Sequence, residues 1–240
     1  MHLVDDAGRV LFAVADGVSS HKGAGTASQI ALEALVRTYH ASARTAAMPK
    51  RLAQAAQQAN IEVHDLALVV PELAGMATTL TAAVLDGATL TTVHTGDCRL
   101  YLLRGGVVRQ LTKDHTVAAA RVRRGLLSAE RARHHPDRSV LTASLGRELI
   151  AAIDRITTPV ESGDVFLICS DGLYAPLGDR EIARCLGEGD AASMCATLIE
   201  RALASETNDN ATAAVVRAVD VPTHPARAGL GARLRRLIGR

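Results

Sequence analysis

The sequence predicts a single α+β domain in which helices cover antiparallel sheets. Segments with a helical spacing of apolar residues occur near both ends of the chain, and a long β-type stretch with hairpin turns lies between them. Strands and helices do not alternate regularly, which argues against a parallel sheet. Neither an internal repeat nor a clean linker interrupts the chain, so we assign residues 1–220 to one domain and residues 221–240 to a basic tail.

The N-terminal part predicts one buried strand followed by two helices. The sequence VLFAVADG, residues 10–17, is an apolar run typical of a buried strand. Apolar residues then recur at helical spacing over residues 23–46 and again over residues 50–69. Pro49 marks the break between these two helices.

A β-type stretch follows over residues 78–111. Three dipeptides give turn signals within it: Asp86-Gly87, Gly96-Asp97 and Gly105-Gly106. They predict an antiparallel meander of about four strands. Residues 114–136 are polar, rich in arginine and prone to form helix, with a turn at Gly125, so we expect a lid or flap there.

The C-terminal third predicts three strands, two helices and the tail. The strands are expected over residues 150–156, 165–169 and 211–219, and the helices over residues 179–186 and 190–205. The tail alternates leucines with arginines. It is either a short amphipathic helix that contacts an acidic partner or a membrane surface, or a frayed, solvated end.

The composition excludes several classes of protein. A net charge of +2 and the scarcity of aromatic residues give no support to nucleic acid binding. The four cysteines form no CxxC pair, which indicates a reducing compartment. We find neither a basic-then-apolar leader nor an apolar run of about 18 residues, so we expect a cytoplasmic protein without a transmembrane segment.

Three aspartates stand at the edges of apolar, β-type runs. Asp16 ends the first strand, Asp171 ends the run DVFLICSDG, and Asp209 leads into the last strand. Carboxylates brought to one spot repel each other unless a cation neutralises them. An all-oxygen set without convincing cysteine or histidine partners favours Mg²⁺ or Mn²⁺ over Zn²⁺. The pattern therefore indicates metal-assisted phosphoryl chemistry.

Over most of its length the chain resembles the bacterial metal-dependent protein phosphatases of the PP2C (PPM) family. The resemblance rests on the order and spacing of these segments: ADGVSSHKGAGTAS, MATTLTAAVL, HTGDCRLYLLRGGVVRQLTKDHT, VLTASLG, ICSDGL and NDNAT. The chain departs from the family pattern at Ala77, where glycine is usual, and at Cys98, where serine is usual. It also has Ser19-Ser20 in place of the usual Gly-Gly.

The resemblance implies a PP2C-like αββα sandwich with a metal site at one end of two antiparallel sheets. Asp16 would bridge two Mn²⁺ or Mg²⁺ ions, and the Gly17 carbonyl would complete the coordination of one of them. Asp171 and Asp209 would bind the second ion, and Asp114 would help Asp171 to hold a weaker third ion.

The implied reaction is hydrolysis of phosphoserine or phosphothreonine in proteins by a metal-bridging hydroxide, in opposition to a Ser/Thr kinase. The general acid is open. His21 is a candidate, and a solvent-facing loop histidine is the other interpretation of this residue.

In the family, a strand with an arginine and an Asn-Glu/Gln-Asp motif precedes the Asp16 strand, and this chain begins where that strand should be ending. We expect Asp5 and Asp6 to lie in the hairpin turn that follows it. Either the true start lies upstream, which the intact metal positions favour, or the site is damaged. In the second case the protein is a pseudophosphatase that acts as a binding or regulatory module. A phosphohydrolase of small phosphate esters is a further rival.

Other polar residues have simpler interpretations. We expect Asp97 to stabilise a hairpin and to pair with Arg99, and His94 to be an ordinary strand residue. His134-His135 has no acidic or cysteine partner at ligand spacing, so it is predicted to lie on the flap surface.

Overall fold

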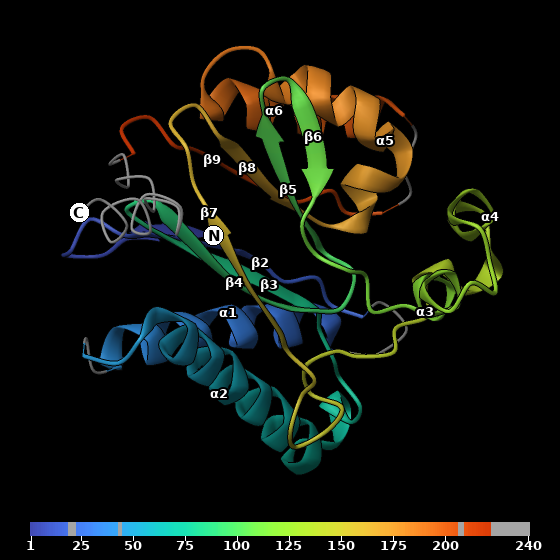
Figure 1. Ribbon diagram of the computed structural model, residues 1–240. Coiled ribbons are helices and arrows are strands. Elements are labelled where there is room, and N and C mark those ends of the chain that lie inside the picture. The colour runs from blue at the N-terminus through green and yellow to red at the C-terminus, as the bar shows by residue number, and fades with distance from the viewer. Residues whose placement is uncertain (19–22, 43–44, 206–208, 222–240) are drawn as a thin grey trace, which may run out of the picture.

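The computed structural model shows two antiparallel sheets packed face to face between two pairs of helices (Figure 1). It describes residues 1–18, 23–42, 45–205 and 209–221. One sheet has the order β1-β2-β3-β4-β7 and the other has the order β6-β5-β8-β9. The strands are β1 (His2–Val4), β2 (Val10–Val14), β3 (Leu80–Asp86), β4 (Thr89–Thr95), β5 (Arg99–Arg104), β6 (Val107–Gln110), β7 (Asp154–Pro159), β8 (Val165–Cys169) and β9 (Ala213–Arg217). The predicted αββα sandwich is confirmed.

Small side chains let two long helices lie close to the five-stranded sheet. Helices α1 (Ala24–Ala41) and α2 (Met48–Val69) share a core rich in buried alanines: Ala27, Ala31, Ala34, Ala55, Ala56 and Ala59. Both predicted helices are confirmed. Pro49 does not separate them, however, because it lies in the first turn of α2, where the missing N–H leaves no hydrogen bond unmade.

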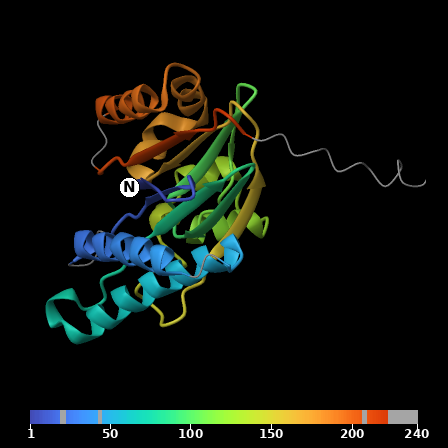
Figure 2. The same cartoon turned by 90° about the vertical axis from the view of Figure 1, so that its left-hand side faces the viewer.

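The sheets bury their facing sides against each other. Phe12 on β2 and Phe166 on β8 are fully buried and belong to the same cluster between the sheets. A further cluster lies between the four-stranded sheet and the helices α5 (Asp171–Leu186) and α6 (Ala191–Ala204). Figure 2 shows the two helix pairs on opposite outer sides of the stacked sheets. Strand β8 is buried along its whole length, because one of its faces packs against the other sheet and the other face packs against α5 and α6.

The predicted four-strand meander is wrong in one respect. Strands β3 and β4 form a hairpin of the five-stranded sheet, and β5 and β6 form a hairpin of the other sheet. Gly96-Asp97 is therefore the crossing between sheets and not a turn within one sheet. Local sequence predicts a hairpin but not its sheet, because β4 and β5 take their other partners, β7 and β8, from much later in the chain.

The other elements differ from prediction mainly in their bounds. Strand β7 begins four residues after the predicted strand, at Asp154. Helix α5 begins already at Asp171 and is broken by non-helical geometry at Gly178 (φ 67°), so the predicted helix over residues 179–186 is only its second half.

The predicted flap contains the short helices α3 (Val117–Arg123) and α4 (Ala129–Arg133) and the 3₁₀ turn η2 (Pro136–Ser139). A second 3₁₀ turn, η1 (Pro71–Leu73), follows α2. As expected, Asp5 and Asp6 lie in the turn between β1 and β2. No helix in the described ranges is long and apolar enough to cross a membrane. The predicted tail falls almost wholly within residues 222–240, outside the described residues, and the domain boundary at residue 220 stays a prediction.

Asn60 fixes the loop that follows the flap. Its fully buried amide donates to the carbonyls of Glu148 and Leu149 and accepts from the N–H of Gly146. We expect Asn60→Ala to lower the free energy of unfolding by about 2–4 kcal/mol, because it leaves the buried N–H of Gly146 without a partner and removes two further hydrogen bonds to partly buried carbonyls. Urea denaturation measures this. The matched control is Gln57→Ala, which removes one partly exposed bond to the same Leu149 carbonyl and should change stability by about 0.5 kcal/mol. Equal effects of the two substitutions would contradict this role.

Candidate metal centre

The backbone of Asp16 is fixed by the start of β3. Its carbonyl accepts hydrogen bonds from the Thr79 N–H (2.8 Å) and the Thr78 hydroxyl (2.9 Å), and its N–H donates to the Thr79 hydroxyl (3.0 Å). All the backbone hydrogen-bonding groups of Asp16 are therefore used within the protein. The carboxylate is held at a defined place beyond the end of β2.

Two glycines allow the aspartate loops to approach other backbone closely. A Cβ on Gly17 would lie 2.1 Å from the carbonyl oxygen of Ala24 at the start of α1. A Cβ on Gly172 would lie 2.5 Å from the carbonyl oxygen of Asn210. Each Asp-Gly pair thus places an aspartate where only glycine can follow it.

Ser170 joins the loop of Asp171 to the loop of Asp209. Its hydroxyl donates to the Asn210 carbonyl (3.1 Å) and accepts from the Thr212 N–H (3.0 Å). This residue was missed at the level of sequence, although its place directly before Asp-Gly was visible. The two loops are far apart in sequence, and the hydroxyl brings them to one end of β8 and β9.

The three predicted aspartates converge and act on one another electrostatically. Burial, then the charges of Asp171 and Asp209, raises the pKa of Asp16 to about 7. The pKa of Asp171 is likewise raised, first by burial and then by Asp209. Desolvated carboxyl groups whose pKa values are raised by neighbouring carboxylates form a site in need of positive charge.

Asp97 is a fourth carboxyl of this cluster, and the expected pairing of Asp97 with Arg99 is wrong. Its side chain is buried, and burial followed by the charges of Asp171, Asp114 and Asp16 raises its pKa to about 8. The Gly96-Asp97 signal was visible in the sequence, but only the crossing between sheets turns Asp97 towards the other acids.

Arg99 instead binds Asp114. Its Nη2 lies 2.7 Å from one carboxylate oxygen of Asp114, and its Nε donates to the other at 3.0 Å. Gln110 adds a further hydrogen bond to Asp114 (2.8 Å), and the Arg99 guanidinium lies 3.7 Å from the ring centroid of Tyr174. Asp114 therefore lies beside the cluster and is already paired with the guanidinium of Arg99. Its role towards a third metal ion stays a prediction.

Among the described residues, neither His94 nor His135 joins the carboxylates. His94 is buried in its strand, with the Thr81 hydroxyl at 2.8 Å from one ring nitrogen and the Lys113 carbonyl at 3.1 Å from the other. Burial, then His115, lowers the pKa of His94 to about 4, so it is neutral, in agreement with the prediction of an ordinary strand residue. His21, the candidate general acid, lies outside the described residues. In the flap, one ring nitrogen of His135 lies 3.0 Å from the Arg121 guanidinium and the other lies 3.1 Å from the backbone nitrogen of Asp137; the neutral ring can accept from only one of them.

The cluster fits a hydrated, hard divalent cation. Within the described ranges, no three Cys, His, Asp or Glu side chains are arranged to hold an ion by themselves. Mg²⁺ keeps several waters and is bound through one or two carboxylates, so it needs no such complete protein cage. The oxygen-only donors and the raised carboxyl pKa values suit that kind of binding.

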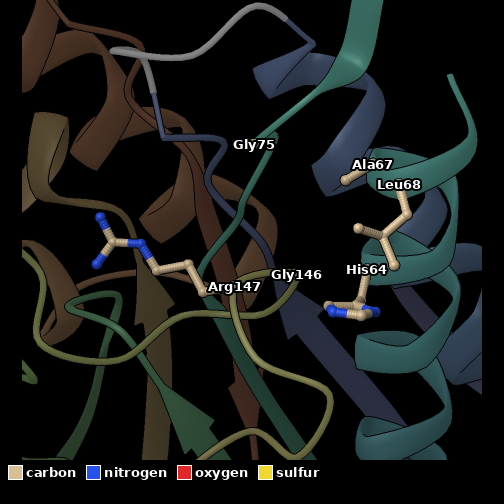
Figure 3. A pocket seen from close by; sticks show the side chains of 6 residues that line it. All are labelled: His64, Ala67, Leu68, Gly75, Gly146 and Arg147. Atoms are coloured by element: carbon tan, nitrogen blue, oxygen red, sulfur yellow. The ribbon is translucent and has the colours of Figure 1, made fainter. Parts of the chain in front are cut away.

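A pocket of about 290 Å³ lies elsewhere, between α2 and the loop after the flap. Its lining residues are His64, Ala67, Leu68, Gly75, Gly146 and Arg147 (Figure 3). No carboxylate of the cluster belongs to this lining. Arg147 extends away from His64 and Leu68, so the pocket has no convergent polar groups and we assign it no chemistry.

Comparison with known proteins decides the family. The sequence profile described as "Protein phosphatase 2C" matches residues 1–217. This chain belongs to the protein phosphatase 2C family. The resemblance drawn from the motifs is thereby confirmed.

The curated relatives are bacterial phosphatases. The chain is 36% identical to the serine/threonine protein phosphatase PstP of Mycobacterium tuberculosis over 227 residues. This alignment covers 93% of the chain and 44% of PstP. It is 33% identical over 178 residues to the serine/threonine phosphatase stp of Listeria innocua, which covers 72% of this chain and 70% of the relative. The chain thus spans less than half the length of PstP.

Solved structures of the 2C family share the fold. The M. tuberculosis phosphatase PstP/Ppp superposes with a TM-score of 0.80 at 34% identity, covering 91% of this chain and 92% of that one. The S. agalactiae serine/threonine phosphatase gives a TM-score of 0.83 at 27% identity, covering 92% and 91%. The catalytic domain of PstP, in complex with two manganese ions, gives 0.78 at 33% identity, covering 91% of both chains.

Proposed function

We propose that this 2C-family chain is a metal-dependent phosphatase that hydrolyses phosphoserine and phosphothreonine in proteins. The observation that carries the proposal is the convergence of Asp16, Asp171 and Asp209 at one end of the two sheets, where burial and neighbouring carboxylates raise the pKa values of Asp16 and Asp171. Family membership and the serine/threonine phosphatases among the relatives support the same activity.

Each carboxylate has a proposed role towards the cations. Asp16 would bridge two Mn²⁺ or Mg²⁺ ions, with the Gly17 carbonyl as a further ligand of one, and Asp171 and Asp209 would bind the second. Asp114 would share a weaker third ion with Asp171. Bound there, divalent ions would lower the pKa of water to near neutrality and would stabilise charge on the phosphoryl oxygens.

The chain's own residues would keep this site rigid. Thr78 and Thr79 hold the Asp16 backbone, and Ser170 holds the loop of Asp171 against that of Asp209. Such preorganisation lets the carboxylates bind cations without a reorganisation of the loops at each turnover. His21 is proposed as the general acid that protonates the leaving serine or threonine oxygen, which departs as a free hydroxyl.

The proposed biology follows from the activity. Substrates would be phosphoproteins in the cytoplasm, and the chain would oppose a Ser/Thr kinase. The manganese complex of the PstP catalytic domain supports Mn²⁺ as the first ion to test.

Phosphate release from a phosphothreonine peptide, with Mn²⁺ or with EDTA, tests the proposal. We expect turnover with Mn²⁺ and none with EDTA. A phosphotyrosine peptide of the same sequence is the control for a general ester hydrolase. A folded chain that binds phosphopeptide but releases no phosphate in Mn²⁺ would instead be a pseudophosphatase, and the proposed activity would be wrong.

A further inference from the structure

Within the assigned domain, residues 1–220, positive charge is concentrated in one segment. This flap segment, residues 117–140, contains six arginines and two acidic residues. The basic tail, residues 221–240, has five arginines and no acidic residue, which leaves the domain with 22 Lys and Arg against 25 Asp and Glu. A strongly basic segment in an otherwise acidic domain calls for a physical explanation.

Much of this charge is exposed and has no acidic partner. Arg121 pairs with Asp137 at 3.0 Å, and Arg133 lies 4.0 Å from Asp179. Among the residues that the structure describes, four exposed arginines of the flap segment form no ion pair: Arg123, which donates to a backbone carbonyl, and Arg124, Arg131 and Arg138, whose side chains form no hydrogen bond either. The last three do not stabilise the fold by internal pairing and are available to an anionic partner.

The flap segment is joined to the carboxylate cluster at both of its ends. At one end, Arg123 donates to the backbone carbonyl of Asp114 (2.9 Å), and the charge of Asp114 acts on Asp97 within the cluster. Figure 1 shows α3 and α4 standing beyond the sheets, on the side where the chain leaves β2. Asp16 follows the end of β2 by two residues in the sequence.

At the other end of the flap segment, isolated β-bridges connect the chain to Gly17, a proposed metal ligand. Leu141 pairs with Thr116, Leu145 pairs with Thr78, and Thr78 pairs with Gly17. The exposed Arg147 follows directly and donates to the Leu141 carbonyl (3.2 Å), which extends the basic surface along this return path. A peptide whose phosphorylated residue reached Asp16 would therefore pass beside the flap segment.

We propose that the flap segment binds acidic residues that flank the phosphorylated residue, and so selects phosphosites in acidic sequences. The inference rests on the proposed function for its substrate, a phosphopeptide. Guanidinium groups pair well with carboxylates. Each exposed ion pair contributes little, but several together raise the association rate and the affinity for an acidic peptide. Such selection weakens as salt screens the charges.

Peptide preference tests the inference. One phosphothreonine peptide carries glutamates on both sides of the phosphoresidue, and a second carries glutamines at the same positions. At low ionic strength we expect the wild-type protein to favour the acidic peptide about tenfold in kcat/KM, which corresponds to a few exposed ion pairs. The variant Arg124→Gln/Arg131→Gln/Arg138→Gln should reduce that preference to about twofold or less.

The matched control removes the same charge elsewhere. Lys50→Gln/Arg155→Gln/Arg184→Gln changes three exposed residues on α2, β7 and α5 and should leave the preference unchanged. Hydrolysis of p-nitrophenyl phosphate, which has no flanking residues, should be the same for all three proteins. A preference that survives in the flap variant, or that falls equally in the control variant, would overturn the inference.

Direct binding separates this inference from the proposed function. If neither peptide is hydrolysed, fluorescence anisotropy of the same labelled phosphopeptides still compares wild type with the flap variant. Weaker binding of only the acidic peptide by that variant supports the inference even without turnover. Flap-dependent binding of anionic vesicles or of an oligonucleotide that exceeds binding of the acidic peptide would overturn it and would identify another partner.

Discussion

Replacing Asp171 by Asn is expected to abolish Mn²⁺-dependent phosphate release, with a loss in kcat/KM of about 10³-fold or more. Changes around a metal ligand already lower affinity or activity by about 10–100-fold, and removal of a ligand is the larger change. Asp171 begins α5 directly after β8, and its charge acts on both Asp16 and Asp97. The measurement is steady-state hydrolysis of a phosphothreonine peptide at saturating Mn²⁺.

The chain offers a matched control for this substitution. Asp86 also precedes a glycine at the end of a strand, but it lies in the exposed turn between β3 and β4. Asp86→Asn should keep full activity, because its side chain is half exposed and the position before a turn accepts Asn as well as Asp. Full activity in a folded Asp171→Asn protein would refute the proposed metal role of this residue.

Much of the fold was predictable because its signals are local. The buried run of β8, the helical spacing in α1 and α2, and the turn at Asp86-Gly87 each depend on residues close together in sequence. The aspartates at the strand ends were equally visible, because a carboxylate that follows an apolar run stands out in any sequence.

What could not be predicted depends on contacts between distant segments. Arg99 could pair locally with Asp97, but the fold offers it Asp114 and the ring of Tyr174, which local sequence does not reveal. Once Arg99 is bound there, Asp97 is left among the other acids. The same distance effect hid the hydroxyl of Ser170, whose partners are the backbone of Asn210 and Thr212.

The fold maintains this cluster at a cost to its own stability. Below about pH 4 the carboxyl groups are protonated in both the folded and the unfolded chain. As the pH rises, the unfolded chain releases protons that folded Asp16 keeps until about pH 7 and Asp97 until about pH 8. The contribution of Asp16 and Asp97 to the free energy of unfolding of the metal-free protein therefore falls as the pH rises through this window.

We accordingly expect the metal-free Asp16→Asn protein to be more stable than the metal-free wild type at about pH 8.5, where the carboxyls of the folded wild type are largely ionised. An increase in the thermal midpoint of about 3–6 °C is expected, because about 1 kcal/mol shifts a domain of this size by about 2–4 °C. The difference between the two proteins should shrink at about pH 5, where folded Asp16 is protonated. Two other groups titrate in the opposite sense, the Met1 amine and His94, whose pKa values are lowered by burial, and they cancel in this comparison.

Mn²⁺ should reverse the order of the two proteins. At a concentration about 100-fold above its Kd, an ion that binds only the folded state stabilises it by about 2.7 kcal/mol, so we expect the wild-type midpoint to rise by about 5–10 °C at about pH 8.5. The Asp16→Asn protein should gain less than about 2 °C, because it lacks the proposed bridging ligand.

Differential scanning calorimetry in EDTA and in Mn²⁺ measures both effects. An equal gain in the two proteins would show that the ion binds elsewhere, and a metal-free variant less stable than wild type at this pH would show that the carboxylates do not repel each other. If both expected results are obtained, the carboxylate cluster lowers the free energy of unfolding and ion binding offsets this loss. For the same reason, the variant expected to be inactive is also expected to be the more stable protein without metal.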